Sequence, residues 1–420
     1  MKIDNIAIKN FRGIRAATLS NLQTMVVIAG QNGSGKSCVL DAIRLLKSVY
    51  GGYLQNEWHH WMNEFQINFN NRNDLTLLCN NPAAEMRITC EFSLHSEERE
   101  YIRVHGEELV RQSVWRSTYP ETYGWSTFRA VPLAAHLRSH ELEIKEKTRL
   151  EIDSLNAELS GDHLIGEFIL APGQDASVRP SKVLEIVFGT FRPHYLGVID
   201  YHGPHRMYGR ETLQGINLNL DALEQQRSQL SLYNVANKYA NVKAEMAGSY
   251  IKEILAEEAG ENSGGRESLS NTLKELFRTF FPDKEFLGPL PTPEGNLMFP
   301  VKTLDGATHD LNELGAGEKE VLYGYLRLRN SAPKFSVILL DEPELHLNPR
   351  LIKGLPDFYH KHLGNALDNQ LWLITHSDAL LREVVGQEGY SVFHMQTSTA
   401  TADEQAAPLL AKEGPAEGGH

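Results

Sequence analysis

The residues that point most directly to chemistry are a run of glycines followed by a lysine and a serine. Residues 30–37 are Gly-Gln-Asn-Gly-Ser-Gly-Lys-Ser. An apolar run, 25–29, comes directly before them, and a helix-like apolar pattern begins at Cys38. Strand, glycine-rich loop and helix in this order are the context in which the G-x-x-x-x-G-K-[ST] spacing holds phosphates. A glycine-rich turn without a nucleotide is the alternative interpretation.

Each residue type of this loop has a physical reason to be there. Gly30, Gly33 and Gly35 let the backbone form a concave nest whose N–H groups point at phosphate oxygens. The helix that begins after the loop adds the partial positive charge of its N-terminus. Lys36 can reach the β- and γ-phosphates, and Ser37 can place its hydroxyl on Mg²⁺. The sequence therefore predicts a site for a nucleoside triphosphate with magnesium.

Two later apolar runs end in polar side chains that suit the same chemistry. Residues 337–340 are apolar and lead into Asp341 and Glu342. Beside the strand of the glycine-rich loop, Asp341 would lie near Mg²⁺ and Glu342 beside the attacking water. Residues 371–375 repeat the design and precede His376, which could sense the γ-phosphate. A solvated acidic strand end and a structural histidine are the alternative interpretations.

The rest of the pattern places these motifs on alternating strands and helices. Residues 2–9 alternate polar and apolar side chains and predict a strand that turns at 11–13 and returns over 16–19. The stretch 137–159 is densely charged with a narrow apolar stripe, which predicts one long amphipathic helix. Further strands are predicted at 25–29, 85–94, 335–340 and 371–375, and further helices at 36–50, 96–112, 349–362 and 378–385.

These elements suggest a discontinuous core with an insertion. We expect the core to combine residues 1–95 with 306–397, and a helical and mixed lobe to be inserted at 96–305. Within that lobe a helical arm would span about 137–160. Residues 398–420 are rich in Ala, Thr, Gly and Glu and predict a disordered tail.

Composition narrows the class of protein. The 420 residues are 41% hydrophobic and 23% charged, as in ordinary globular proteins. The sequence has no apolar stretch long enough to cross a bilayer, no signal-peptide pattern and no metal-type spacing among its three cysteines. We therefore expect a cytoplasmic protein without membrane contact. The net charge of −13 argues against broad nonspecific attraction to nucleic acid, but a local basic groove around 103–138 stays an alternative to solvated surface charge.

Together the motifs resemble the ATP-binding-cassette (ABC) class of ATPases, in its RecF, SMC and OLD branch. The resemblance covers about 1–50 and 306–385, and only loosely the region between them. The matching segments are 10–12 (the N-terminal motif of the branch), 30–37 with 40–43 (Walker A of the RecF and SMC proteins), 341–349 (an OLD-type Walker B and D-loop) and 375–377 (the switch histidine).

The resemblance implies a fold, cofactors and a set of site residues. The implied fold is an ABC-type α/β ATPase with a mixed sheet core, an N-terminal antiparallel β part and a helical lobe that carries the arm. The implied cofactors are ATP and Mg²⁺. Catalytic roles are implied for Glu342 and His376, and metal contacts for Ser37 and Asp341. Nucleotide contacts are implied for Arg12, Gly30, Asn32, Gly33, Ser34, Gly35, Lys36, Ser37, Cys38, Gly315, Gly317 and Glu318.

The signature motif departs from the family pattern. The candidate segment, 314–319, is Leu-Gly-Ala-Gly-Glu-Lys. Gly315 stands where the family has a serine that donates to the γ-phosphate bound by the opposite subunit. Backbone N–H groups and a helix N-terminus can still receive a phosphate there. We therefore expect ATP-driven dimerisation to persist and hydrolysis to be slow.

The spacing of the motifs excludes several relatives. About 280 residues separate Lys36 from Leu314, too many for a compact transporter cassette and too few for an SMC-type rod. About 44 residues follow His376, and they contain no acidic metal cluster of the Toprim type found in OLD nucleases. We therefore expect any nuclease activity to belong to a partner protein.

Two segments between the motifs, 58–65 and 200–206, resemble those of AriA- and PtuA-like bacterial anti-phage ATPases. Metal binding by His202 and His205 is an alternative to a structural or nucleotide-adjacent loop there. The function implied is an ATPase that forms dimers or higher homo-oligomers on ATP. It would be a sensor or scaffold for a separate effector encoded nearby, expected to be a nuclease, in phage defence. The alternatives are a RecF-like ATP-dependent DNA-binding repair factor and an interaction protein whose ATP is structural.

Overall fold

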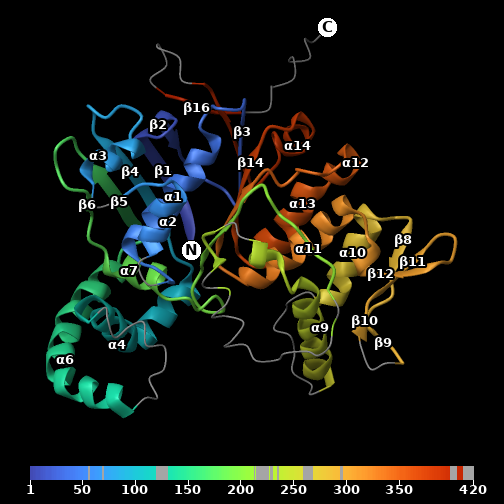
Figure 1. The fold of residues 1–420 in the computed structure, drawn as a ribbon, viewed down its shortest axis with the longest axis horizontal. Helices are drawn as coiled ribbons and strands as arrows, with labels where there is room; N and C mark the ends of the chain where they lie inside the picture. Colours follow the sequence, from blue (N-terminus) through green and yellow to red (C-terminus); the bar gives the residue numbers. More distant parts are fainter. Residues whose placement is uncertain are drawn as a thin grey trace, which may run out of the picture.

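The fold is taken from a computed structural model of the chain (Figure 1). The described residues are 1–54, 57–68, 71–119, 131–211, 213, 227, 230–233, 236–258, 268–293, 297–397 and 404–409.

The central sheet combines strands from both ends of the sequence. Its order is β16 (Ala406–Pro408), β15 (Tyr390–Met395), β3 (Met25–Gly30), β14 (Gln370–Thr375), β13 (Val337–Asp341) and β7 (Ile199–His202). The strands from β15 to β7 run parallel, whereas β16 pairs antiparallel with β15. The interior strands β3, β14 and β13 are buried almost throughout, which explains their near-continuous apolar sequences. The expected mixed sheet core is confirmed.

A second, antiparallel sheet is built around the start of the chain. Its order is β2 (Ile14–Leu19), β1 (Lys2–Phe11), β4 (Met86–Ser93), β5 (Leu164–Leu170) and β6 (Ser177–Val178). Strict alternation of buried and partly buried residues along β4 shows that one face of this sheet covers an apolar core. The predicted hairpin of 2–9 with 16–19 is therefore confirmed, as is the antiparallel N-terminal part.

Helix α1 (Lys36–Tyr50) lies between the two sheets and contacts strands of both (Figure 1). Most of its side chains are buried, as expected for a helix enclosed on several sides. Alternate residues of β3 enter two different apolar cores: Val26 and Ile28 pack on the side of α1, and Met25 and Val27 on the opposite side with α11 (Ala316–Ser331). The sheet is thus held from both faces, which fixes the positions of its strand ends.

The remaining elements form the lobes around this core (Figure 1). Helices α4 (Ser96–Thr118) and α6 (Val131–Leu159) pack against each other, and Gly106 lets Leu155 approach the α4 backbone closely. The predicted long helix of the arm is therefore confirmed. The other elements are α2 (Glu57–Glu64), α3 (Arg72–Leu75), α7 (Lys182–Gly189), α9 (Val242–Glu258), α10 (Leu269–Phe280), β8 (Lys284–Phe286), β9 (Leu290–Pro291), β10 (Leu297–Met298), β11 (Pro300–Thr303), β12 (Thr308–Asp310), α12 (Pro349–Ile352), α13 (Leu355–Tyr359) and α14 (Asp378–Val384).

Three predictions need correction. The span 96–305 is not wholly an inserted lobe, because β5, β6 and β7 pair into the two sheets of the core. The helix predicted over 349–362 is divided at Gly354, whose φ of 78° lies in the left-handed region. The tail predicted as disordered contains β16, which is anchored because the Gln405 N–H donates to the Ala16 carbonyl and the Leu409 N–H to the Val392 carbonyl. Residues 398–403 and 410–420 lie outside the described residues.

Within the described part of the chain, no helix combines the length and apolar character needed to span a membrane.

Candidate functional site

The carboxyl ends of four neighbouring parallel strands meet at one edge of the central sheet. β3 leads into the glycine-rich loop, β14 leads into His376, β13 ends at Asp341, and β7 ends at His202. β14 lies between β3 and β13, so the loop and the acidic strand end flank the histidine. Ligands of parallel α/β sheets bind at this edge because the strand ends and helix N-termini converge there. The topology thus brings three distant sequence motifs together.

The glycine-rich loop has the backbone that its sequence predicts. Gly33 and Gly35 have φ values of 81° and 92°, and a Cβ on Gly30 would lie 2.3 Å from the Met395 carbonyl oxygen. The Lys36 Nζ donates to the carbonyls of Gly30 (2.8 Å) and Gln31 (2.9 Å), which closes the loop on itself. These contacts hold a lysine where a negatively charged ligand would compete for it.

One buried hydroxyl in this loop supports the fit of a phosphate group. Ser34 is fully buried, and within the described part of the chain its Oγ has no hydrogen-bond partner. Buried polar atoms are nearly always paired in native structures, so an unpaired one at a functional loop favours a ligand that completes it. The side chain of Asn32 is exposed beside this loop. The predicted loop residues 30–37 are therefore gathered in one place.

The acidic strand end lies against the loop. The Ser37 hydroxyl hydrogen-bonds the Asp341 carboxylate. The pKa of Asp341 is raised to about 6, chiefly by burial; the Ser37 hydrogen bond opposes the shift, and the nearby Glu342 and Asp41 carboxylates add to it. Burial also lowers the pKa of Lys36, against the opposing effect of Glu342 and Asp341. Lys36 and Asp341 therefore share one electrostatic environment, although they are about 300 residues apart in sequence.

This donor set fits a magnesium ion. Mg²⁺ prefers carboxylate and hydroxyl oxygens and keeps several waters and phosphate oxygens in its shell. Ser37 and Asp341 supply two such oxygens side by side. Among the described residues there is no cluster of three or more His, Cys, Asp or Glu side chains that could hold a metal alone.

Glu342 and His376 face each other at the same edge. The His376 Nδ1 lies 3.1 Å from the Glu342 Oε1, and both side chains are partly exposed. Glu342 has a φ of 50°, a conformation that strains a residue with a Cβ, and its N–H donates to the Ile374 carbonyl (3.0 Å). Strained backbone concentrates at sites where a side chain must be aimed. The arrangement can orient a water molecule and accept its proton.

The N-terminal turn lies beside the loop, but its arginine is engaged elsewhere. A Cβ on Gly13 would lie 3.6 Å from the Gly35 Cα and 3.6 Å from the Cys38 Sγ. Arg12 forms an ion pair with Asp41, and its guanidinium lies 4.1 Å from the centre of the Phe65 ring. The predicted contact of Arg12 with a phosphate stays a prediction.

The candidate signature segment begins α11. The Gly315 N–H donates to the Glu318 Oε2 (2.9 Å), and the other carboxylate oxygen of Glu318 accepts from the Lys284 Nζ (2.7 Å). Gly317 packs against the loop that follows β13, where its Cβ would lie 3.2 Å from the His346 carbonyl oxygen. Contact of this segment with a nucleotide, as predicted from Gly315, Gly317 and Glu318, stays a prediction.

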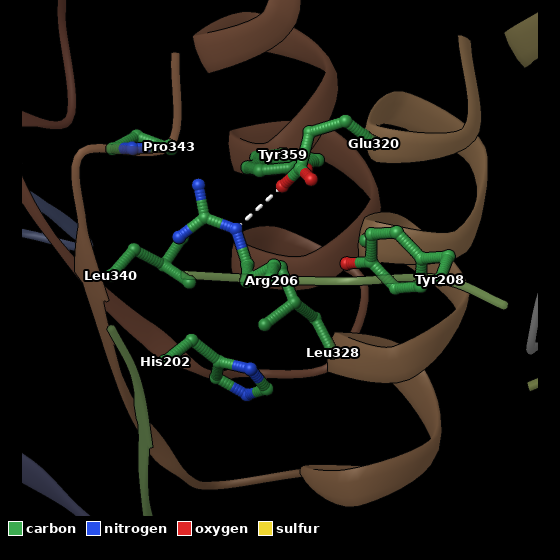
Figure 2. A pocket seen from close by; sticks show the side chains of 9 residues that line it. His202, Arg206, Tyr208, Glu320, Leu328, Leu340, Pro343 and Tyr359 are labelled. Carbon is green, nitrogen blue, oxygen red and sulfur yellow. Dashed lines mark hydrogen bonds and ion pairs between the residues drawn. The ribbon is translucent and has the colours of Figure 1, made fainter. Parts of the chain in front are cut away.

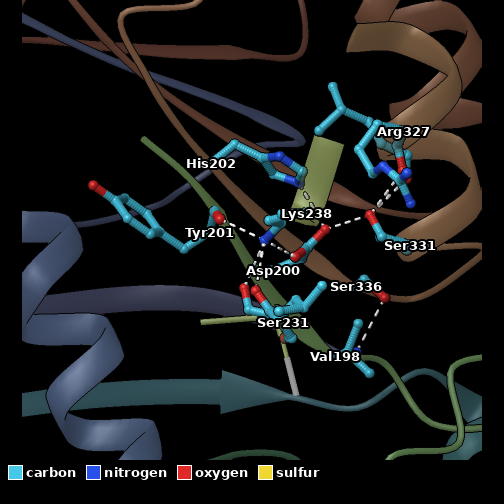
Figure 3. Close-up of polar contacts among 12 residues, drawn as sticks. Val198, Asp200, Tyr201, His202, Ser231, Lys238, Arg327, Ser331 and Ser336 are labelled. Carbon is cyan, nitrogen blue, oxygen red and sulfur yellow. Dashed lines mark hydrogen bonds and ion pairs between the residues drawn. The ribbon is translucent and has the colours of Figure 1, made fainter. Parts of the chain in front are cut away.

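Sequence reasoning missed several charged residues at this edge. Glu344 is buried, accepts a hydrogen bond from Thr375, and contributes to the charge around Lys36. Arg206 is buried beside the backbone of the acidic strand end (Figure 2). Asp200, on β7, and Lys238 form a buried ion pair of 2.7 Å (Figure 3). Asp200 and Arg206 are the two ends of the segment 200–206, which the sequence singles out without indicating a role for either side chain.

Removing the charge of Asp341 is expected to increase the free energy of unfolding of the protein. Its pKa of about 6 lies above the ordinary value of 3.8, so the folded state holds the proton more tightly and stability falls as pH rises from about 4 to about 6. Without added nucleotide, Asp341→Asn is expected to raise the free energy of unfolding by about 1–3 kcal/mol at pH 7. Thermal melts at pH 4.5 and 7.5 measure this, and a variant that is less stable than wild type at pH 7.5 would contradict it.

One family of proteins matches most of this chain, and a short relative matches part of it. A family described as "AAA domain, putative AbiEii toxin, Type IV TA system" matches residues 25–382. An uncharacterized protein of Methanocaldococcus jannaschii is 47% identical over 51 residues, which are 12% of this chain and 23% of that protein. The matched part is thus about a quarter of that relative's length.

Solved structures of SMC heads are similar over nearly the whole chain at low identity. An SMC head bound to the C-terminal winged-helix domain of ScpA is 14% identical, with 98% of each chain covered and a TM-score of 0.47. The SMC head domain from Thermotoga maritima is 12% identical, with 98% of this chain and 100% of that chain covered and a TM-score of 0.41. Since the family match includes both the glycine-rich loop and the acidic strand end, the chain belongs to this family of AAA domains.

Proposed function

We propose that this chain is an ABC-type ATPase that binds ATP with Mg²⁺, hydrolyses it slowly and assembles with further copies of itself when ATP is bound. The observation that carries the proposal is the meeting of Lys36, Ser37 and Asp341 with Glu342 and His376 at one edge of the sheet. A phosphate-binding loop, a pair of metal-ligating oxygens and a base for water are the parts that phosphoryl transfer needs.

Each residue has a role in this proposal. The loop N–H groups and Lys36 bind the phosphates, and Ser37 with Asp341 would hold Mg²⁺, which when bound neutralises charge on the phosphates. Glu342 orients the attacking water and accepts its proton, and His376 holds the Glu342 carboxylate in place. The half-exposed position of His376 lets it contact a ligand at the same time.

Assembly follows from the exposed signature segment. Gly315 is exposed at the start of α11, and its N–H donates to the Glu318 carboxylate. A phosphate bound to another copy would take the place of this carboxylate at the helix N-terminus. ATP held between two copies would favour a closed assembly by population shift. We propose that this closed state controls a separate effector, a nuclease, in anti-phage defence. The toxin system named in the family description fits that role.

Size measurement with and without nucleotide tests the proposal. The purified protein is expected to shift to a dimer or larger species when ATP and Mg²⁺ are added. Lys36→Ala should abolish both ATP binding and this shift, because the side chain that closes the loop and reaches the phosphates is gone. Light scattering and nucleotide titration measure the two effects. Equal sizes with and without ATP in the wild type would contradict ATP-driven assembly.

The same preparation distinguishes the DNA-repair alternative. A RecF-like factor would bind DNA tightly only with ATP, and the affinity would fall steeply with salt. The defence proposal instead predicts that a co-purified effector protein changes its association when ATP is added.

A further inference from the structure

A single buried arginine connects three parts of the molecule at the catalytic edge (Figure 2). The Arg206 Nη1 donates to the carbonyls of Gly203 (2.7 Å) and Asp341 (2.9 Å), and its Nη2 to the carbonyl of Glu342 (2.7 Å). Its Nε donates to the Glu320 Oε1 at 2.5 Å. The guanidinium therefore links the loop after β7, the end of β13 and helix α11.

The bonds on the β13 side hold the backbone that aims Glu342. Arg206 donates hydrogen bonds to two consecutive carbonyls, those of Asp341 and Glu342. They lie where the backbone takes the left-handed conformation of Glu342. A guanidinium is a rigid planar fork, so its bonds fix the direction of both carbonyls together. Displacement of Arg206 would thus rotate the turn that points Glu342 at His376.

The bond on the other side reaches the helix of the signature segment. Glu320 lies about one turn into α11, and Gly317 in the same turn packs on the His346 carbonyl of the loop that follows β13. A small cavity lined by Tyr208, Gly324 and Tyr359 lies beside the ion pair (Figure 2). Apolar side chains of α11 and β13 pack in one core, and the Arg206–Glu320 pair adds a direct polar link between the helix and the end of the strand.

Stability alone is a weak reason for such a pair. Both side chains are more than nine-tenths buried, and removing two charges from water offsets most of their mutual attraction. The pair instead gives a movement of α11 a direct path to the Glu342 backbone.

We propose that Arg206 and Glu320 are positioning residues that transmit contact at the start of α11 to the catalytic turn of Glu342. Nucleotide bound to a second copy would press on the signature segment, shift α11 and, through this pair, set Glu342 for hydrolysis. The inference rests on the proposed function, because it needs ATP-driven assembly. Under this proposal, contact with a second copy raises the turnover of a chain through the Arg206–Glu320 pair of that chain.

Glu320→Gln tests the inference, because it keeps the shape and removes the charge. Turnover per subunit in the wild type is expected to rise with protein concentration as copies assemble. In Glu320→Gln this rise should be lost, and kcat at high protein concentration should fall by about threefold to thirtyfold. The affinity for ATP at low protein concentration should stay within about twofold, because the phosphate loop is untouched. Arg206→Lys, which keeps the charge but lacks the fork, should give the same pattern.

Two further variants control the experiment. Glu320→Asp keeps the carboxylate and should retain the concentration dependence. Glu143→Gln removes an exposed carboxylate on α6 that pairs with Lys147 at 2.7 Å, and should behave as wild type. Wild-type turnover that does not change with protein concentration would overturn the proposed assembly. A wild type that shows the dependence, together with a Glu320→Gln variant that shows it equally, would overturn the role of this pair alone.

Discussion

Replacing Glu342 by glutamine is expected to lower the rate of ATP hydrolysis by about 10²- to 10⁴-fold while ATP binding persists. The amide of glutamine fills the same space as the carboxylate and keeps a contact with His376, which lies 3.1 Å away. It cannot accept a proton from the attacking water. The Lys36 loop and the Ser37–Asp341 pair stay intact, so the nucleotide should still bind with near wild-type affinity.

The same variant should accumulate in the assembled state. In the proposed function, hydrolysis opens the ATP-bound assembly, so its loss would shift the population toward the closed form. Single-turnover hydrolysis, nucleotide titration and light scattering measure the three quantities on one preparation. Asp341→Asn is the informative comparison, because it should lose magnesium-dependent binding as well as turnover. A Glu342→Gln variant that hydrolyses ATP within threefold of wild type would show that another group accepts the proton.

The parts of the site that the sequence predicts are those built from local pattern. The loop 30–37 carries its own conformation, because glycines at fixed spacing adopt the required φ values between a buried strand and a helix. Asp341 and His376 could be placed because each follows a buried strand, and parallel strands end at the same edge. Neither inference needs a contact between distant residues.

The parts that the sequence does not predict depend on long-range pairing of charged or featureless segments. Arg206 and Glu320 are residue types that usually lie in water, and only their mutual contact across 114 positions makes burial possible. β7 has only four residues, too few to separate it from the surrounding lobe by pattern. β16 lies in a small-residue segment and is fixed by backbone hydrogen bonds, which any sequence can make.

The engagement of Arg12 shows the same limit at a single residue. Resemblance assigns it to a phosphate, yet in the structure Asp41 and the Phe65 ring hold it. Asp41 lies on a helix that the sequence predicts, whereas Phe65 follows α2, for which the sequence predicts no helix, and nothing in either pattern indicates the pairing. A motif therefore predicts which residues lie near a ligand better than it predicts the side chains that these residues contact when no ligand is bound.

Breaking the buried charge network beneath the catalytic edge is expected to be the most destabilising change in this chain. Asp200 accepts from the Lys238 Nζ (2.7 Å), from the His202 Nε2 (2.7 Å) and from Ser331 on α11 (Figure 3). Asp200 and Lys238 are almost fully buried, and their partners hold the pKa of Asp200 far below its usual value against the effect of burial. Asp200→Asn leaves the Lys238 ammonium buried without a countercharge. The expected loss is about 3–5 kcal/mol of unfolding free energy.

The network should also make the protein sensitive to acid. Burial lowers the pKa of His202 to about 4, below its ordinary value of 6.5, although Asp200 opposes the shift. The unfolded chain therefore binds a proton between these two values while the folded chain does not, so stability is lost as pH falls from about 6.5 to about 4. The depressed pKa of Asp200 acts in the same direction at lower pH, because its carboxylate must be protonated when the protein unfolds in acid.

A double-mutant cycle separates the charge pair from general damage to the core. Lys238→Met alone and Asp200→Asn alone each leave one buried charge without a countercharge. The double variant removes both charges and should recover most of the lost free energy of unfolding. Urea unfolding at pH 7.5 measures all four proteins. Glu313→Gln, which breaks an exposed pair with Arg210, is the matched control and should change stability by less than about 0.5 kcal/mol. If Asp200 and Lys238 are coupled, each single substitution leaves the other charge unpaired, and the two losses do not add. Additive losses would instead show that the two residues stabilise the sheet edge independently.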